Sequence, residues 1–574
     1  MVDRTDRIRT EPLRGELGNG AEPTRDADVI AGYLRDASGV VGEASALFRP
    51  ESEAEVAAIL ARAHIEKTVV TVVAAQTSTT GSSVPPTGWL LSTEKLKAQG
   101  SIDKAGLRAV CGAGTMLGAF QDGLEAEGLM YPPDPTSRRD CTLGGTVGCN
   151  ASGPRSLRFG ATRSWIRGMR VVLACGEVLD IKRGVHRASA GEAFEIVHSE
   201  DPGRCAFAAE ADDKAPQHTR VAVPSFSLPA EIKNASGYFG GDDVDLIDLF
   251  IGSEGTLGVV TEVEVALMAK PAGCLSMMLF FADEANALKL IEQTRTGALE
   301  PGMPQPDSLE WFDRESLAII AADISEFTIP GTARVALFVE QFIHERDGLG
   351  ELALMGRWLK LLEACGALSR TPNGVQIAQT QEQREMMERV RHAVPAGVNE
   401  QVARNGMPKL GTDLAVADKH LQSMFDVYHA AADAPLTLLD ASERAQLLAS
   451  VGAELAEGTP VTSEMLCEAG FPERLASVVF GHVGNNHLHV NFLPKTGAGL
   501  ALARAVIGHL TRFAIARGGS PSAEHGIGKI KRAALRQRTG ETGFEQMLAI
   551  KLALDPRGCL GPGNLFEKDD VTRG

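Results

Sequence analysis

Two stretches near the C-terminus carry the residues best suited to chemistry. The first, G-H-V-G-N-N-H-L-H-V-N at 481–491, holds three histidines within eight residues. The second, S-A-E-H-G-I-G at 522–528, places Glu524 directly beside His525. Neutral imidazoles and a carboxylate together form a ligand set suited to a divalent metal such as zinc or manganese. A further histidine next to such a metal has the intrinsic pKa to remove a proton near neutral pH. The pattern therefore indicates metal-assisted proton abstraction.

The size and composition of the chain limit its class. With 574 residues, of which 44% are hydrophobic, the chain can bury a large core and should divide into more than one domain. Its formal net charge of -17 argues against a nucleic-acid partner. The nine cysteines are scattered and form no C-x-x-C pair. This arrangement argues against a disulfide scaffold, a structural zinc module and a cysteine-ligated iron–sulfur cluster.

The sequence also suggests a cellular location. The N-terminus, M-V-D-R-T-D-R-I-R-T-E-P, is charged, mixed in sign and without the apolar core of a secretory signal. We see no apolar run long enough to span a membrane. We therefore expect a cytoplasmic protein, and peripheral contact with the inner face of the membrane through a partner remains an alternative.

The elements that must position the histidines begin with a regular N-terminal half. Residues 1–40 are polar and predict a flexible arm or an extra helix. Apolar spacing predicts a helix at 53–64, and β-branched residues predict a strand at 68–73. A strand pair is expected at 169–180, and the charged, irregular segment 185–232 resembles an inserted surface loop.

The second half has a different pattern. Strands at 277–281 and 336–340 alternate with helices such as 284–296, which predicts an α+β domain with an antiparallel sheet. A polar, helix-prone insertion at 435–470 precedes the histidine motif and is a candidate contact for a homodimer. Helices at 499–517 and ending near 555 flank the Glu524–His525 loop.

Glycine and other small residues cluster three times in the first half. The segment P-P-D-P-T-S-R-R-D-C-T-L-G-G-T-V-G-C-N-A-S-G at 132–153 would let backbone approach a large flat or phosphorylated ligand. The hydroxyl-rich loop at 74–86 could bind a pyrophosphate, and I-G-S-E-G-T-L-G-V-V-T-E at 251–262 repeats the pattern. Ordinary turn chemistry explains one such cluster but is a poorer explanation of three. No cluster is a G-x-G-x-x-G or a P-loop, so neither a Rossmann nicotinamide site nor an ATPase is supported.

Taken together, these segments resemble the FAD-linked oxidases with a PCMH-type flavin domain, of the vanillyl-alcohol oxidase superfamily. Within them, the chain is most similar to the group of D-lactate dehydrogenase, D-2-hydroxyglutarate dehydrogenase and the FAD-linked subunit of glycolate oxidase. The resemblance extends from about 46 to 566 and includes the C-terminal motif L-D-P-R-G-C-L-G-P-G at 554–563.

The resemblance implies an α+β fold with four parts. These are an N-terminal arm at 1–40, a two-subdomain FAD-binding domain at 41–270, a cap domain for the substrate at 271–500 and a C-terminal helical segment at 501–574. The cap would close over the flavin, and the C-terminal segment would return to it and complete the active site.

The resemblance also implies cofactor contacts. FAD would be bound without a covalent link, because the 74–83 loop has no histidine for flavin attachment. The phosphate loop would supply Gln76, Thr77, Ser78, Thr79, Thr80, Gly81 and Ser82. The flavin and ribityl chain would contact Pro133, Asp134, Gly145, Gly148, Asn150 and Ser152, and the adenine end would contact Gly255, Gly258, Val259 and Val260.

Metal and substrate residues follow from the same resemblance. His482, His489 and Glu524 match the metal ligands of the family, with Asn491 as a nearby polar contact, and His525 matches the catalytic base. His487 occupies a place that is usually Asn, so a role outside the ligand set is favoured for it. Arg391 is the first choice and Lys409 the second for binding the substrate carboxylate.

The implied activity is the metal-assisted oxidation of a D-2-hydroxy acid, with D-lactate as the first choice and D-2-hydroxyglutarate or glycolate as alternatives. Electrons would pass to an external cytochrome, quinone, electron-transfer flavoprotein or iron–sulfur subunit. One rival is a non-redox enzyme of the alkyl-dihydroxyacetone-phosphate synthase group, but its consecutive histidine run is replaced here by a spaced H-x-H. Another rival is a flavin-binding subunit without its own active site, against which the retained histidines argue.

Overall fold

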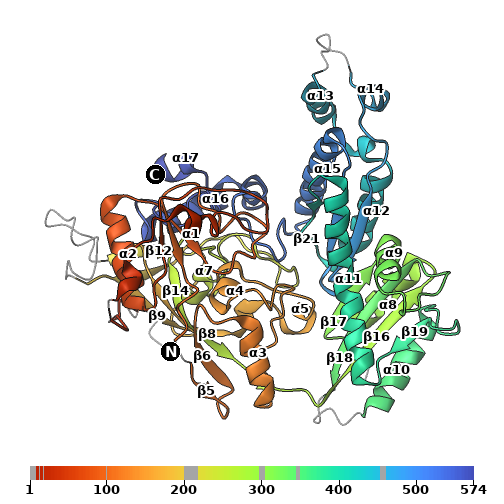
Figure 1. The fold of residues 1–574 in the computed structure, drawn as a ribbon, viewed down its shortest axis with the longest axis horizontal. Helices are drawn as coiled ribbons and strands as arrows, with labels where there is room; N and C mark the ends of the chain where they lie inside the picture. Colours follow the sequence, from red (N-terminus) through yellow and green to blue (C-terminus); the bar gives the residue numbers. More distant parts are fainter. Residues whose placement is uncertain are drawn as a thin grey trace.

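The computed structural model describes all residues except 1–7, 12, 17, 99, 200–217, 297–303, 344–349, 453–459 and 574. Two α+β halves lie side by side, and the last helices of the chain return to lie over the first half (Figure 1). This architecture confirms the predicted fold class.

The first half contains two sheets of different kinds. A three-stranded parallel sheet has the order β2 (Ala46–Phe48), β4 (Trp89–Ser92) and β3 (Val70–Val73). Helix α2 (Glu53–Glu66) packs its apolar face against this sheet, and the Ser52 side chain caps its first turn. A five-stranded antiparallel sheet has the order β5 (Ile102–Asp103), β6 (Arg108–Gly112), β14 (Val259–Ala266), β8 (Ile166–Val172) and β9 (Val178–Lys182).

Short helices and strands complete this half. They are α3 (Leu117–Ala126), α4 (Leu143–Cys149), α5 (Ser156–Phe159), α7 (Leu246–Phe250) and the pair β7 (Leu129–Met130) with β15 (Met268–Ala269). Helix α4 lies within the glycine-rich segment, and Asn150 ends it in a left-handed conformation.

Two expectations about the surface of this half need correction, although the extra helix that was one alternative for the N-terminal arm is present at Ala27–Ala31. The N-terminal arm is anchored, because β1 (Ile8–Arg9) pairs in parallel with β11 (Ala193–Val197) and α1 (Ala27–Ala31) packs on the parallel sheet. The segment 185–232 is partly ordered as sheet, since β11 also pairs with β12 (His218–Ala222), and β10 (Arg187–Ala188) pairs with β13 (Val244–Asp245). Alternating apolar residues in β11 bury Phe194 and Ile196, and the charged residues between them hid this period.

The cap is built on a fully antiparallel eight-stranded sheet. Its order is β19 (Val375–Ile377), β16 (Gly273–Phe281), β18 (Val335–Ile343), β17 (Ser308–Phe312), β22 (Ser477–Gly481), β23 (His487–Phe492) and β20 (Leu410–Gly411), with β21 (Leu414–Ala415) also on β23.

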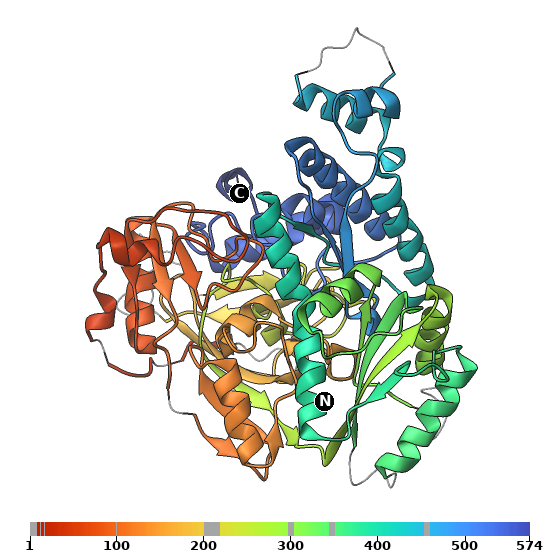
Figure 2. The ribbon, with the colours of Figure 1, turned by 45° about the vertical axis from the view of Figure 1, so that its right-hand side comes forward.

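Both faces of the cap sheet are covered, so its strands bury side chains on both sides. In β16, Leu279 and Phe281 face one core while Met278 and Phe280 face the other. The first core includes α8 (Glu284–Thr296), α10 (Glu351–Ala364), α12 (Leu421–Asp433), α13 (Ala441–Ser450), α14 (Ser463–Glu468) and α15 (Gly497–Ala516). The second includes α9 (Arg314–Asp323) and α11 (Gln381–Asn405). Helices α13 and α14 project from the end of the cap (Figure 2).

Helix α15 corrects one expectation from the sequence. Among the described residues it alone is long and apolar enough to cross a membrane by length and composition, although no such run was expected. Its buried residues, including Leu502, Val506 and Leu510, pack into the first cap core. Core helices of other proteins meet the same criterion.

The C-terminal segment ties the cap to the first half. After Glu524 and His525 the chain reaches the 74–83 loop, where the Lys529 amide donates to the Thr80 carbonyl at 2.9 Å. Helices α16 (Arg532–Leu554) and α17 (Lys568–Arg573) follow. Between them, Leu560 forms a parallel bridge with Val70 at the edge of the parallel sheet. The loop that carries Glu524 is thus held against the glycine-rich half.

Candidate active site

Four side chains converge where the histidine strand meets the C-terminal loop. His482 follows β22, His487 and His489 lie two residues apart on β23, and Glu524 comes from the loop after α15. One ligand atom from each of these four residues lies within 4.8 Å of the other three. The structure therefore brings the three predicted ligands together and places His487 among them.

Outer carboxylates orient two of the imidazoles. Nδ1 of His482 lies 2.9 Å from Oε1 of Glu310, and its Nε2 lies 3.4 Å from Oε1 of Glu524. Nε2 of His487 lies 3.0 Å from Oδ1 of Asp413 and its Nδ1 faces Glu524 at 3.9 Å, and neither nitrogen forms a hydrogen bond with good geometry among the described residues. A carboxylate behind a ligating histidine is the usual outer support of a metal site.

His489 is held differently. Its Nδ1 lies 3.4 Å from the Thr412 carbonyl, which leaves Nε2 toward Glu524, 3.9 Å from Oε2. Its ring stacks on that of His525, with centroids 5.4 Å apart and planes at 16°.

The pKa shifts in this cluster are mixed. Burial would lower the pKa of His482, but Glu524 and Glu310 outweigh it and raise that pKa, whereas the other two imidazoles and the carboxylate suit a cation. Burial lowers the pKa of His487 to about 4, and burial with the neighbouring imidazoles holds the pKa of His489 well below its usual value. Both rings are therefore neutral near pH 7 and keep a lone pair for a metal. Burial would raise the pKa of Glu524, but Lys233 and His482 outweigh it and keep the carboxylate ionised. The donor set and the partnerless Nδ1 of His487 fit a divalent ion.

Asp413 organises the other side of the cluster. This buried carboxylate accepts hydrogen bonds from the backbone amides of Glu524 and His525 at 3.1 and 3.0 Å. It also lies 3.5 Å from Nδ1 of His525, leaving Nε2 of that ring as the atom that can receive a substrate proton. Burial lowers the pKa of His525 despite the nearby Asp413, so the ring is available as a neutral base at pH 7.

Each buried carboxylate of the site is paired with one cation. Glu310 accepts from Nε of Arg391 at 2.5 Å, and Asp413 accepts from Nζ of Lys531 at 2.6 Å. The third pair joins Glu524 to Lys233.

A pocket of about 650 Å³ opens in front of the cluster. Its lining includes both predicted carboxylate-binding residues, Arg391 and Lys409, as well as His525. Arg391 is already engaged with Glu310, whereas Lys409 has no ion pair with the described residues. The other lining residues that matter here are His482, His489, Asn491, Phe312, Phe480 and Thr79 of the phosphate loop.

A second, narrower cleft of about 110 Å³ lies between the two sheets of the first half. Nine of the predicted FAD contacts line it, namely Gln76, Thr77, Ser78, Ser82, Gly145, Gly148, Gly255, Gly258 and Val260. A Cβ at Gly148 would meet no atom within 4 Å, so a side chain there would fill the cleft. Gln76 and Gly255 have positive φ and turn their backbone around the same space. The small residues and free backbone fit a dinucleotide such as FAD.

Other predicted FAD residues have different contacts. Val259 is buried in the core beside the parallel sheet, and Gly81 accepts a hydrogen bond from Lys529. The Thr80 hydroxyl lies 3.3 Å from the His525 carbonyl, which links the predicted phosphate loop to the predicted base. The Pro133 carbonyl accepts a hydrogen bond from Gln121, and Asp134 forms an ion pair with Arg155. The Asn150 side chain donates to the Asn234 carbonyl and accepts from the Arg163 amide. The Ser152 hydroxyl donates to Glu524.

A further group of potential ligands lies in the first half. Cys175, Glu177 and His198 are buried together. Both nitrogens of His198 are engaged, with Glu177 at 2.6 Å and with the Thr219 hydroxyl at 2.7 Å. The hydrogen bonds of this group connect the start of β9 with the strand pair β11 and β12.

Four residues of the site were not found from the sequence: Lys233, Glu310, Asp413 and Lys531. A signal existed for Glu310, because a carboxylate inside the apolar strand S-L-E-W-F requires a buried partner. Asp413 lies in the segment that contains Lys409, but its role depends on long-range contacts.

Family comparisons place this geometry in context. A model described as "FAD binding domain" matches 44–182, and one described as "FAD linked oxidases, C-terminal domain" matches 271–565, just over half of the chain. The chain belongs to the FAD-linked oxidases. Together with the cleft, the family makes it an FAD-dependent oxidoreductase and confirms the resemblance.

Full-length relatives of this FAD-linked oxidase are distant. They include the glycolate oxidase subunit GlcD of Bacillus subtilis, 25% identical over 92% of this chain and 90% of that protein. The D-2-hydroxyglutarate dehydrogenase of Xanthomonas citri is 26% identical over 92% and 90%, and the D-lactate dehydrogenase of Archaeoglobus fulgidus is 24% identical over 91% and 91%.

Solved structures share the fold. An alkyldihydroxyacetonephosphate synthase superposes with a TM-score of 0.58 at 13% identity, covering 97% of this chain and 88% of that one. p-Cresol methylhydroxylase superposes at 0.59 and 14%, covering 95% and 93%. At such identities these likenesses show the fold alone, so the substrate must be argued from the site.

Proposed function

We propose that this FAD-linked oxidase is a metal-assisted dehydrogenase that converts a D-2-hydroxy acid, with D-lactate as the first choice, into the 2-oxo acid. The observation that carries the proposal is the convergence of His482, His489 and Glu524 beside His525 in a pocket that also contains Arg391 and Lys409. The relatives named for hydroxy-acid oxidation support the substrate class.

The residues would divide the work as follows. The residues of the cleft would hold FAD, which supplies a hydride acceptor, and His482, His489 and Glu524 would hold a divalent ion, which supplies Lewis-acid polarisation of the substrate hydroxyl. His487, for which the sequence favoured a role outside the ligand set, would join it, because its Nδ1 lies 3.9 Å from Oε1 of Glu524. Neutral His525 would accept the hydroxyl proton at Nε2, and Asp413 would stabilise the imidazolium that forms.

The substrate carboxylate needs a cation in the same pocket. Lys409 has no partner among the described residues, and Arg391 keeps its two terminal nitrogens beyond the Nε bond to Glu310. We propose that both contact the carboxylate and so fix the α-carbon relative to the base. Electrons would then leave the flavin for an external acceptor.

The test is flavin bleaching in the FAD-loaded protein under anaerobic conditions. D-lactate, D-2-hydroxyglutarate, glycolate and the L-isomers would each be mixed with protein, with and without added zinc or manganese. We expect rapid bleaching by a D-isomer that depends on the metal. Bleaching by none of these acids would refute the proposed function, and equal bleaching after complete metal removal would refute the metal's role.

A further inference from the structure

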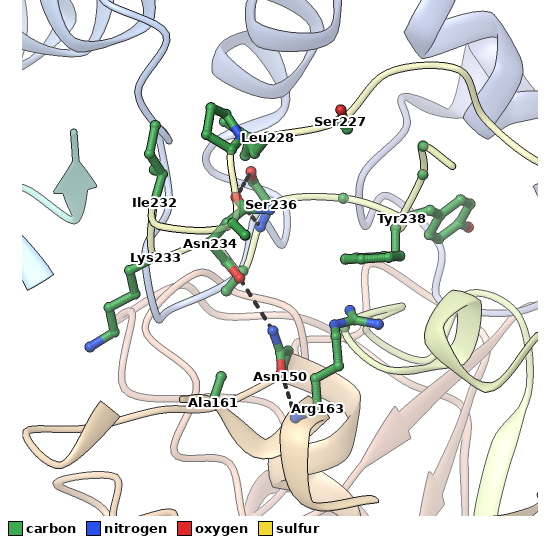
Figure 3. Close-up of a pocket in the computed structure, with 18 of the residues that line it drawn as sticks. Asn150, Ala161, Arg163, Ser227, Leu228, Ile232, Lys233, Asn234, Ser236 and Tyr238 are labelled. Atoms are coloured by element: carbon green, nitrogen blue, oxygen red, sulfur yellow. Dashed lines mark hydrogen bonds between the residues drawn. The ribbon is translucent and has the colours of Figure 1, made fainter. Parts of the chain in front are cut away.

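Lys233 ends in the middle of the candidate metal site although it belongs to a loop on another cavity. The loop lines a cavity of about 540 Å³ that also contains Asn150 and Arg163. In Figure 3 the Lys233 side chain extends away from Asn150, Arg163 and Tyr238. Its side chain is only 4% exposed, so its charge needs a buried partner.

That partner is a single oxygen of Glu524. The ammonium of Lys233 donates to Oε1 of Glu524 and lies 3.4 Å from the Gly153 carbonyl. The Ser152 hydroxyl donates to the same Oε1 at 3.2 Å.

Two ligand nitrogens approach the same oxygen, whereas Nε2 of His489 lies 3.9 Å from the other oxygen, Oε2. Nε2 of His482 and Nδ1 of His487 lie 3.4 and 3.9 Å from Oε1 of Glu524. An ion bound by these nitrogens and by Oε1 would therefore share its carboxylate oxygen with a buried ammonium.

The positive charges of the ion and of the Lys233 ammonium make it unfavourable for both to contact the same Glu524 oxygen. Glu310, Asp413 and Glu524 are each already paired with one cation, so the ion-free site has no unpaired carboxylate to neutralise a metal. Two cations in contact inside a poorly screened site repel strongly.

We propose that Lys233 competes with the divalent ion for Glu524, so that the ion binds only when the ammonium leaves Oε1. Lys233 is then a positioning residue that keeps Glu524 in place in the ion-free protein and limits the affinity for the metal. The inference rests on the metal site of the proposed function but does not depend on the substrate.

Calorimetric titration of zinc into metal-stripped, FAD-loaded protein tests the competition. Lys233→Met removes the ammonium, and Lys409→Met removes an equal charge from the adjoining pocket without touching Glu524. We expect the zinc Kd of Lys233→Met to fall by about tenfold or more, because a like charge beside the ion is removed. The Kd of Lys409→Met should stay near that of the wild type.

Thermal unfolding provides a second readout. Stripped Lys233→Met should unfold at a lower temperature than the wild type, and zinc should raise its Tm by more than it raises the wild-type Tm. If Lys233→Met does not fold, Lys233→Gln keeps a neutral donor to Oε1 and should show the same tighter binding.

The outcomes separate the inference from the proposed function. Zinc binding by the wild type with an equal or weaker affinity in the Lys233 variants would overturn the competition and leave the metal site intact. The absence of zinc binding in every protein would overturn both the competition and the metal's role.

Discussion

Contacts with the Asp413 carboxylate fix the orientation of the His525 ring and determine which of its nitrogens can accept a proton. The carboxylate lies at Nδ1 of His525, accepts from its backbone amide and binds Lys531, so the imidazole is fixed with Nε2 left for the substrate. The same carboxylate also lies beside His487, so the proposed base and a candidate ligand both depend on one group.

Replacing the base tests this arrangement at the residue scale. His525→Gln should lower the rate of flavin reduction by D-lactate by about 10²- to 10⁴-fold, the usual contribution of a general base. Zinc affinity should change little, because Nε2 of His525 is not needed to hold the ion. Anaerobic rapid mixing measures the rate, and His509→Gln on α15 controls for loss of a histidine. A loss smaller than about fivefold would exclude His525 as the base.

At this scale the sequence motifs were informative for some residues only. His482, His489 and Glu524 could be predicted because two short motifs contain complementary ligands. Lys233 could not, because its partner Glu524 is 291 residues away and its own segment is irregular. Nor could the engagement of Arg391 with Glu310, which depends on the packing of α11 on the cap sheet.

Among the elements, helix α9 helps to position the histidine strand. Its N-cap, Asp313, accepts hydrogen bonds from the Ser316 amide at 2.8 Å and from the Val479 amide on β22 at 2.9 Å. Val479 lies three residues before His482. The N-cap residue of α9 therefore fixes the end of the strand that precedes the candidate ligand His482.

Loss of the Asp313 N-cap should lower both the stability of the protein and its affinity for zinc. Asp313→Ala should lower the free energy of unfolding by about 2 to 4 kcal/mol, because it removes a cap and leaves the Val479 amide without a partner. Urea denaturation at constant m measures the loss. Zinc should also bind more weakly.

Asp440→Ala is the matched control for that variant. Asp440 caps α13 in the projecting insertion and accepts from the Glu443 amide at 2.8 Å. Its removal should cost about 1 kcal/mol and leave zinc affinity unchanged. Equal zinc affinity in both variants would contradict the role given to α9.

Elements with a clear period were predictable. The helix expected at 284–296 is α8 (Glu284–Thr296), and the helix expected at 53–64 is α2 (Glu53–Glu66). The strands β1 and β11 were missed because each buries only one or two residues and forms only with its distant partner.

At the scale of the whole molecule, the C-terminal segment connects the FAD cleft with the cap. Glu254 of the cleft accepts hydrogen bonds from the Ile527 and Gly528 amides at 2.7 and 2.8 Å. Burial raises its pKa to about 7, although these amides oppose the shift.

The buried Glu254 predicts a stability that depends on pH. Because its pKa is near 4.5 in the unfolded chain, the folded state holds more protons between about pH 4.5 and 7. This group therefore lowers stability as pH rises through that window, by up to about 3 kcal/mol. In FAD-free protein, the free energy of unfolding of Glu254→Gln should fall less than that of the wild type as pH rises through this window. Urea unfolding at several pH values measures the difference.

The test compares the pH dependence of stability in the wild type with that in Glu254→Gln. Asp307 and Asp313, whose pKa values are also raised, to about 6, affect the stability of both proteins equally and cancel in the comparison. Parallel stability curves for wild type and Glu254→Gln would show that Glu254 does not titrate in this window.

The most direct test of the account is to locate the metal itself. Crystals of the FAD-loaded protein soaked in zinc should show an anomalous peak bound by His482, His489 and Glu524, on the pocket side that faces the flavin. A peak only at Cys175, Glu177 and His198, or no peak at any zinc concentration, would contradict it.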